Sequence, residues 1–176
     1  MYARLLVAIA LAAVIAVPAS AQVKKSEMPG IRNYSRVDAT VGCGGAVDAT
    51  AMSALKKEGY VSVINLRLAN EPGADVDAGR AAAKAAGLKY IHLPFNAAQP
   101  DPAVVDQFLG AVADTSNQPV FVHCGSANRV GGVWMIKRVL QDGWAIDRAK
   151  TEAEAIGLSS AQLVTFATDY INSHKK

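Results

Sequence analysis

Short apolar runs alternate with amphipathic segments along most of the chain. Three runs rich in β-branched or aromatic residues predict buried strands, at 61–66, 90–93 and 119–123. Apolar residues that recur every three or four positions predict helices over 48–58, 75–86, 101–112, 130–140, 147–156 and 160–173. Strands that alternate with helices indicate an α/β fold, with a mainly parallel central sheet flanked by helices.

Helix start and stop signals support these boundaries. Asp48 stands where an N-cap would open the first helix, and Gly59 follows its expected end. Asp101 precedes Pro102, which is the usual order of a capping carboxylate and a first-turn proline. Gly143 lies just past the helix predicted to end at Leu140. The sequence therefore predicts helices with defined ends and no long linker between them.

The first 21 residues have the layout of a secretory signal peptide. Arg4 precedes an apolar run from Leu5 to Val17, and Ala19-Ser20-Ala21 supplies the small residues of a cleavage site. The run is shorter than the roughly 20 apolar residues that cross a bilayer, so a permanent anchor is the weaker alternative. We expect cleavage between Ala21 and Gln22, and a periplasmic or secreted mature protein without a stable membrane anchor.

Composition indicates one globular domain after this leader. The chain has 176 residues, of which 51% are hydrophobic and 19% charged. Residues 22–31 look like a loose N-terminal arm, and 32–176 form the expected domain. A formal net charge of +3 is too close to neutrality to argue for a nucleic acid or an anionic membrane as partner. Composition leaves the oligomeric state open.

The chain contains two cysteines, Cys43 and Cys124. In an exported protein a cysteine pair usually forms a structural disulfide. Cys43, however, lies in the glycine-rich run 41–45, which we expect to be flexible, whereas Cys124 directly follows an apolar strand. Cys43 is therefore either a reversible redox partner of Cys124 or a small buried residue.

The segment 120–132 combines a strand, a cysteine, a loop of small residues, an arginine and a helix start. Amides of such a loop, at the positive end of a helix, form a nest for anions. The same field favours the thiolate of Cys124, and Arg129 supplies a planar fork of donors for an oxyanion. The alternative is an inert buried cysteine with an arginine in a surface ion pair. Expected substrate-binding residues are His123, which shapes the loop, Gly125, Ser126, Ala127 and Asn128.

The segment from His123 to Arg129 resembles the signature loop of cysteine-dependent phosphatases of the protein-tyrosine and dual-specificity superfamily. The segments 59–67, with Glu71, and 90–94 are similar to the phosphatase-domain branch of bacterial beta-lactamase hydrolase-like proteins. The resemblance covers about 32–143. It implies a dual-specificity-phosphatase-like fold and phosphoester hydrolysis through a phosphocysteine at Cys124, with Arg129 and the loop amides binding the phosphoryl oxygens. No cofactor or metal is expected.

Three departures from this pattern keep other functions open. Four residues separate Cys124 from Arg129, where these phosphatases have five, and such a loop resembles that of rhodanese-type sulfurtransferases. Val130 replaces the usual hydroxyl residue. No acid occurs in 94–97, where a general acid is expected, so the nearest candidate is Asp101, which is also a strong capping residue. A persulfide-forming sulfurtransferase and a non-catalytic oxyanion-binding module remain alternatives to a phosphatase acting on small or exposed phosphoesters.

Polar residues also follow the first predicted strand. Arg67 and Glu71 come just after 61–66, and they form either an ion pair that holds a loop near the site or a simple tie between that loop and the body.

Overall fold

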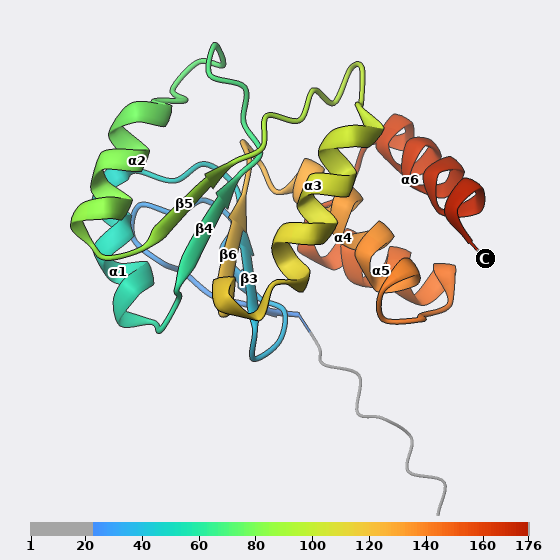
Figure 1. Ribbon diagram of the computed structural model, residues 1–176, viewed down its shortest axis with the longest axis horizontal. Helices are drawn as coiled ribbons and strands as arrows, with labels where there is room; N and C mark the ends of the chain where they lie inside the picture. Colours follow the sequence, from blue (N-terminus) through green and yellow to red (C-terminus); the bar gives the residue numbers. More distant parts are fainter. Residues whose placement is uncertain (1–22, 176) are drawn as a thin grey trace, which may run out of the picture.

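The computed structural model describes residues 23–175 and contains one mixed sheet (Figure 1). Its strand order is β1-β2-β3-β6-β4-β5. The pairs β1–β2 and β2–β3 are antiparallel, and β3, β6, β4 and β5 run parallel to one another. The strands are β1 (Lys24–Lys25), β2 (Ser35–Arg36), β3 (Val41–Gly44), β4 (Ser62–Asn65), β5 (Lys89–His92) and β6 (Val120–His123). The prediction of a mainly parallel central sheet is confirmed.

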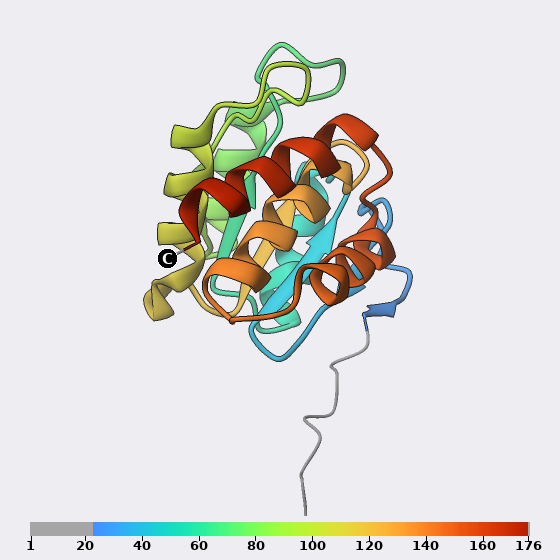
Figure 2. The same cartoon turned by 90° about the vertical axis from the view of Figure 1, so that its right-hand side faces the viewer.

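Helices cover both faces of this sheet (Figures 1 and 2). Helices α1 and α2 lie on one face, and α3, α4, α5 and α6 lie on the other. The bounds are α1 (Met52–Lys57), α2 (Val76–Ala85), α3 (Pro102–Ala113), α4 (Asn128–Leu140), α5 (Ile146–Ile156) and α6 (Ala161–His174). Two short 3-10 turns, Ala49–Ala51 and Thr115–Asn117, precede α1 and β6. The six predicted helices are therefore present, with ends shifted by a few residues at most.

Alternate residues of the central strand β6 supply two separate cores. Val120 and Val122 pack with α3–α6, whereas Phe121 packs with α1, α2 and Tyr60. This alternation follows from the pleat of a strand, which points successive side chains to opposite faces. Both faces of β6 are buried, as expected for a strand in the middle of a parallel sheet.

Side-chain caps begin three of the predicted helices. Asp75, Asp101 and Ser160 each accept a hydrogen bond from a backbone N–H of the first turn of α2, α3 and α6. The expectation for Asp48 was wrong, because its side chain makes no capping bond. The chain instead enters α1 through the 3-10 turn Ala49–Ala51, in which the backbone provides the first bonds.

The glycine-rich run 41–45 is not the flexible segment that its composition indicated. It contains β3, whose four residues are all buried between β2 and β6. Gly42 is required there by close packing, since a Cβ at this position would lie 1.9 Å from the Tyr60 hydroxyl oxygen. Small residues here allow dense packing, and they do not indicate mobility.

The segment expected to be a loose arm is attached to the sheet over the part that the structure describes. Lys24–Lys25 pairs with Ser35–Arg36, and Ile31 bridges to both Met28 and Val47. Ile31 is buried in the smaller core, which gives this segment a hydrophobic anchor. The predicted signal peptide, residues 1–21, lies outside the described residues. Among the helices from residue 23 to 175, none has the length and apolar character needed to span a membrane.

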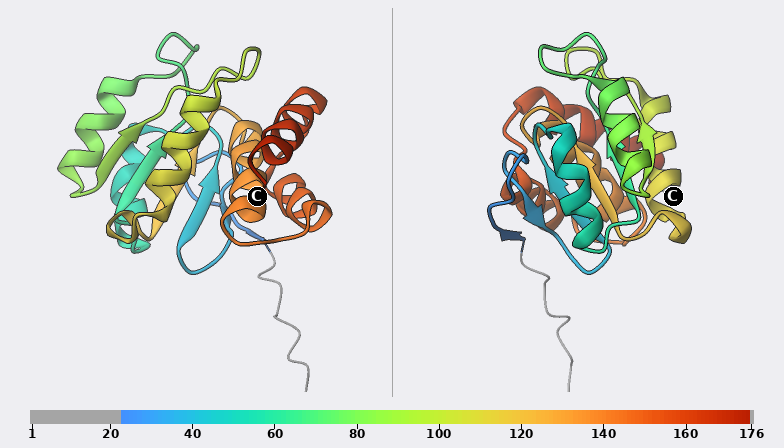
Figure 3. Two further views of the ribbon diagram at one scale, coloured as in Figure 1. Left: turned by 45° about the vertical axis from the view of Figure 1, so that its right-hand side comes forward. Right: turned by 90° about the vertical axis from the view of Figure 1, so that its left-hand side faces the viewer.

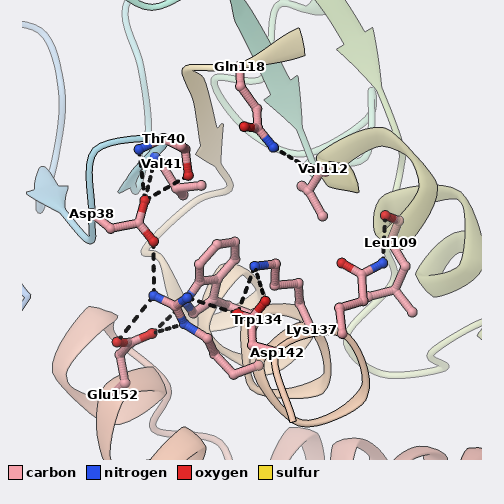
Figure 4. A network of polar contacts seen from close by, with 12 residues as sticks. Asp38, Thr40, Val41, Leu109, Val112, Gln118, Trp134, Lys137, Asp142 and Glu152 are labelled. Atoms are coloured by element: carbon pink, nitrogen blue, oxygen red, sulfur yellow. Dashed lines mark hydrogen bonds and ion pairs between the residues drawn. The ribbon is translucent and has the colours of Figure 1, made fainter. Parts of the chain in front are cut away.

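An ion cluster centred on the buried Arg138 and Glu152 joins α4 and α5 to the turn before β3 (Figure 4). Arg138 Nε donates to Glu152 Oε1 at 2.6 Å, and Arg138 Nη1 and Nη2 donate to Asp142 and Asp38 at 2.8 and 3.1 Å. The guanidinium also lies over the rings of Trp134 and Trp144. Its charge is therefore matched by several carboxylates, as burial of a charged group requires.

Candidate active site

The candidate site lies at the carboxyl edge of the parallel strands. Cys124 directly follows β6, and the loops after β4 and β5 rise beside this edge (Figures 1 and 3). The chain then turns through 125–127 and enters α4 at Asn128. Ligands of parallel α/β sheets bind at this edge, where strands end and helices begin.

Three successive carbonyl groups of this loop are bonded to the body of the protein. Gly125 O accepts from Ala46 N at 3.0 Å, and Ser126 O accepts from Asn33 Nδ2 at 3.3 Å. Ala127 O accepts from Gly131 N at 2.9 Å, which begins the hydrogen bonding of α4. Each of these carbonyl groups is therefore directed away from the interior of the loop.

The amides of the same loop have no such partners. Within residues 23–175, no backbone N–H from Gly125 to Arg129 donates a hydrogen bond to the protein. Ala127 has φ of +75°, a left-handed conformation that is rare for a residue with a Cβ. Unpaired amides in succession, at the positive end of a 13-residue helix, are the donors that an oxyanion requires. The predicted anion nest thus has a structural basis in the five amides.

The side chain of Arg129 is held next to this loop by Glu71. Arg129 Nη1 donates to Glu71 Oε1 at 2.5 Å and Nη2 donates to Oε2 at 2.8 Å. Nη1 also reaches the carbonyl groups of Leu66 and Phe95, so the loops after β4 and β5 both contact the arginine. Burial opposes the charge of Arg129, but the bond to Glu71 and the proximity of Cys124 leave the pKa of Arg129 above its ordinary value.

Glu71 is itself fixed by the loop that carries it. Arg67 Nε donates to Glu71 Oε2 at 3.2 Å, and the Leu68 amide donates to Oε1 at 2.8 Å. The bond from Arg129, together with these donors, lowers the pKa of Glu71 to about 2 despite its partial burial. Arg67 and Glu71 therefore do more than tie their loop to the body, because they place the carboxylate that orients Arg129.

Cys124 is almost fully buried, with 1% of its surface exposed, and it packs in the larger core. His123 precedes it but points to the other face of the sheet, where its ring stacks on Phe121. Burial lowers the pKa of His123 to about 4, which makes the ring neutral at pH 7. The ring lies near the carbonyl groups of Gly45 and Cys124, yet neither ring nitrogen completes a hydrogen bond with a described residue. His123 therefore packs beneath the loop, on the face of the sheet opposite to Cys124.

Cys43 and Cys124 are both free thiols in the described structure. Cys43 lies on β3 beside Val122, inside the larger core. Burial, with Glu152 and Asp38 nearby, raises the pKa of the Cys43 thiol well above its ordinary value. A buried thiol of this kind is a poor nucleophile, so the structure favours the small-buried-residue interpretation of Cys43.

Asp101 was predicted to cap a helix or to act as a general acid, and the structure shows that it caps α3. Its Oδ1 accepts from the Ala103 amide at 2.9 Å. The loop between β5 and Asp101 contacts the site at Phe95, six positions before Asp101. The contact is the hydrogen bond from Arg129 to the Phe95 carbonyl. Asp106, on the next turn of α3, is bonded to the Tyr170 hydroxyl. The catalytic role of Asp101 stays a prediction.

Two features of the site could not be found in the sequence. The contact of Glu71 with Arg129 joins residues 58 positions apart, and Asn33 reaches Ser126 across 93 positions. Arg67 and Glu71 carried a signal as a charged pair after a strand, but Asn33 carried none. Among the described residues, no group of histidine, cysteine and carboxylate side chains is arranged to hold a metal ion.

Comparison with known proteins defines the relationship of this chain. Residues 34–141 match the family described as "Beta-lactamase hydrolase-like protein, phosphatase-like domain". The chain belongs to this family. It is also 32% identical, over 114 residues, to the beta-lactamase hydrolase-like protein of Xylella fastidiosa strain Temecula1. That alignment covers 62% of this chain but 26% of the relative, so the chain matches only about a quarter of the longer protein.

Solved structures show that this phosphatase-like domain has the protein-tyrosine and dual-specificity phosphatase fold. P. aeruginosa TpbA superposes with a TM-score of 0.67 at 23% identity, covering 89% of this chain and 92% of TpbA. The core catalytic domain of the PP-IP phosphatase SIW14 from S. cerevisiae gives 0.68 at 18% identity, covering 84% and 91%. A cysteine-to-serine variant of TpbA has been solved in complex with phosphotyrosine. The family and the fold together support a cysteine-based hydrolase of the phosphatase type.

Proposed function

We propose that this protein is an exported phosphatase that hydrolyses small or exposed phosphoric monoesters through a phosphocysteine at Cys124. The observation that carries the proposal is the loop after β6, in which unpaired amides and the Glu71-held guanidinium of Arg129 surround the position of a nucleophilic cysteine. This arrangement supplies both the attacking group and the donors that phosphoryl transfer requires.

In the first step the Cys124 thiolate attacks phosphorus. The S–P bond forms while the P–O bond to the leaving group breaks, and its electron pair goes to the leaving oxygen. The amides of 125–129 and Arg129 donate to the three equatorial oxygens, which gain negative charge in the transition state. Because Glu71 holds both terminal nitrogens of Arg129, the guanidinium keeps its orientation before the substrate arrives.

In the second step water attacks the phosphocysteine. The water oxygen forms a new P–O bond and gives up a proton to the solvent while the S–P bond breaks, so phosphate leaves and the thiolate is restored. Asp101 is occupied in capping α3, so this proposal favours leaving groups that depart as stable anions, such as phenolates. The phosphotyrosine bound to the TpbA variant is an aryl phosphate of this kind.

The deciding experiment is phosphate release from p-nitrophenyl phosphate by the reduced protein, with Cys124→Ser measured beside it. We expect turnover that is lost in Cys124→Ser and reduced strongly in Arg129→Lys, which keeps the charge but loses the planar fork. Turnover that persists in Cys124→Ser would exclude the phosphocysteine. The export part is tested separately by N-terminal sequencing of the mature protein, which should begin at Gln22.

Sulfur transfer is a second candidate, favoured by the four-residue spacing between Cys124 and Arg129 and by the capping role of Asp101. Thiosulfate would give its outer sulfur to Cys124, releasing sulfite, and cyanide would take that sulfur as thiocyanate. Thiocyanate formation without phosphate release, from folded and reduced protein, would replace the phosphatase proposal.

A further inference from the structure

Asn33 binds the outer side of the loop that runs from Cys124 to Arg129, which is called the catalytic loop below. It lies between β1 and β2, far from the loop in sequence, and its carboxamide nitrogen donates to two carbonyl groups. One belongs to Ser126, at 3.3 Å, and the other to Ile156 at the end of α5, at 3.2 Å. Its carbonyl oxygen accepts from Lys25 Nζ at 2.7 Å. A single side chain thus joins the N-terminal segment, the catalytic loop and α5.

The bond to Ser126 controls the direction of one peptide group. A peptide is planar, so the Ser126 carbonyl and the Ala127 N–H point in opposite directions and must rotate together. While Asn33 holds the carbonyl outward, the Ala127 N–H faces the interior of the loop. If this peptide rotated, a carbonyl oxygen would replace an amide in the anion nest and would repel an oxyanion.

The conformation of Ala127 makes such a rotation a real alternative. Its φ of +75° is unfavourable for a residue with a Cβ. Strained backbone of this kind persists only where surrounding contacts impose it. Close packing supplies some of them, because a Cβ at Gly157 would lie 3.0 Å from Ala127 Cβ and 3.1 Å from Asn33 Nδ2. Asn33 supplies the direct hydrogen bond.

We propose that Asn33 is a positioning residue, which fixes the Ser126–Ala127 peptide so that the Ala127 amide serves the oxyanion site. Asn33 touches the loop from outside and acts on the substrate only through it. The inference rests on the proposed function, because it takes the bound anion to be the phosphoryl group of a substrate. Its test also includes binding and alkylation measurements that do not require turnover.

Two variants and one control separate this role from general stability. Asn33 has φ of +52°, so Asn33→Gly keeps the backbone and removes the amide. Asn33→Asp keeps the shape and replaces the donor by an acceptor facing two carbonyl oxygens. Lys25→Met removes the outer bond to Asn33 and leaves the donor to Ser126 in place. All three are compared with the unaltered protein by circular dichroism and thermal melting.

The first measurement is binding of tungstate by calorimetry, and the second is the rate of alkylation of Cys124 by iodoacetamide across a pH series. We expect Asn33→Gly and Asn33→Asp to weaken tungstate binding about tenfold and to move the alkylation profile to higher pH, because one amide no longer faces the anion. With p-nitrophenyl phosphate, kcat should fall roughly 10- to 100-fold. Lys25→Met should stay close to the unaltered protein.

Folded Asn33→Gly and Asn33→Asp proteins with unchanged tungstate affinity and an unchanged alkylation profile would overturn the proposal. A loss matched by Lys25→Met would also overturn it, since the donor to Ser126 would then not be the cause. If the unaltered protein binds tungstate but releases no phosphate, the proposed function fails while the two binding measurements still decide the role of Asn33.

Discussion

Glu71 binds Arg129 through two parallel hydrogen bonds, one from each terminal nitrogen of the guanidinium to a separate carboxylate oxygen. The two residues come from different elements, the loop after β4 and the first turn of α4. Arg129 is therefore oriented by the protein before any anion binds, which reduces the ordering that binding would otherwise require.

Glu71→Gln should lower activity without unfolding the protein. The substitution keeps the size of the side chain but places an amide NH₂ against one Arg129 nitrogen, so the two-bond contact is lost. We expect kcat/KM for p-nitrophenyl phosphate to fall roughly 10- to 100-fold. Glu154→Gln is the matched control, because Glu154 forms an exposed pair with Lys150 at 3.7 Å on α5. Equal activity of the two variants would contradict the role given to Glu71.

Asp101→Asn separates capping from acid catalysis. Asparagine caps a helix about as well as aspartate, so α3 should keep its start and the melting temperature should change little. From the capping contact we expect kcat for p-nitrophenyl phosphate to stay within about twofold of the unaltered protein, whereas loss of a general acid would reduce it about 10²- to 10⁴-fold. A large loss, with the alkaline limb of the pH profile removed, would assign the acid to Asp101 after all.

His123 should make the protein less stable in mild acid. Its pKa is lowered from 6.5 to about 4 by burial, so the unfolded chain binds a proton at a higher pH than the folded chain does. The folded state therefore has its full stability, with respect to this histidine, above pH 6.5. Stability is lost as the pH falls from 6.5 toward 4, because the unfolded chain binds a proton there and the folded chain does not. Urea unfolding across this window should show a decline of order 1–3 kcal/mol. The decline should be smaller in His123→Asn, with the exposed His174→Asn as control.

Arg138→Met should strongly destabilise the fold. It would leave the buried Glu152 and the half-buried Asp38 without their cation, and breaking a buried pair such as Arg138–Glu152 costs about 3–5 kcal/mol of unfolding free energy. The double variant with Glu152→Gln should recover part of this loss, because Gln still accepts from Trp134 Nε1 and carries no charge. A double variant less stable than the single one would show that charge burial is not the cause.

Local patterns in the sequence predict most of the helices and the central strands. Strand β6 and helix α3 are examples, since an apolar run or a cap followed by proline specifies each within a few residues. The edge strands β1 and β2 contain two residues each, too few to produce a pattern. Strand β3 was missed because glycine usually marks a turn, whereas here it accommodates the Tyr60 hydroxyl.

The loop from Cys124 to Arg129 was also recognisable as a candidate site, because a cysteine, small residues and an arginine follow one another between a strand and a helix. Its supporting contacts were not recognisable. Asn33 and Glu71 meet the loop only after the chain has folded. Asn33 does not differ locally from an ordinary surface residue, and Glu71 stood out only as one member of a charged pair that follows a strand. Such contacts depend on topology, which sequence periodicity does not specify.

Finally, the supports of the loop lie partly outside the segment that matches the family. That segment spans 34–141, whereas Asn33 precedes it, and Ile156 and the Ser159 and Ser160 amides bonded to Asn128 follow it. A chain ending before α5 would contain Cys124, Arg129, Glu71 and Asn33 and yet lack Ile156 and the Ser159 and Ser160 amides. During synthesis Cys124 would therefore emerge well before the contacts around its loop are complete, and those contacts would form only when the segment from α5 onward docks.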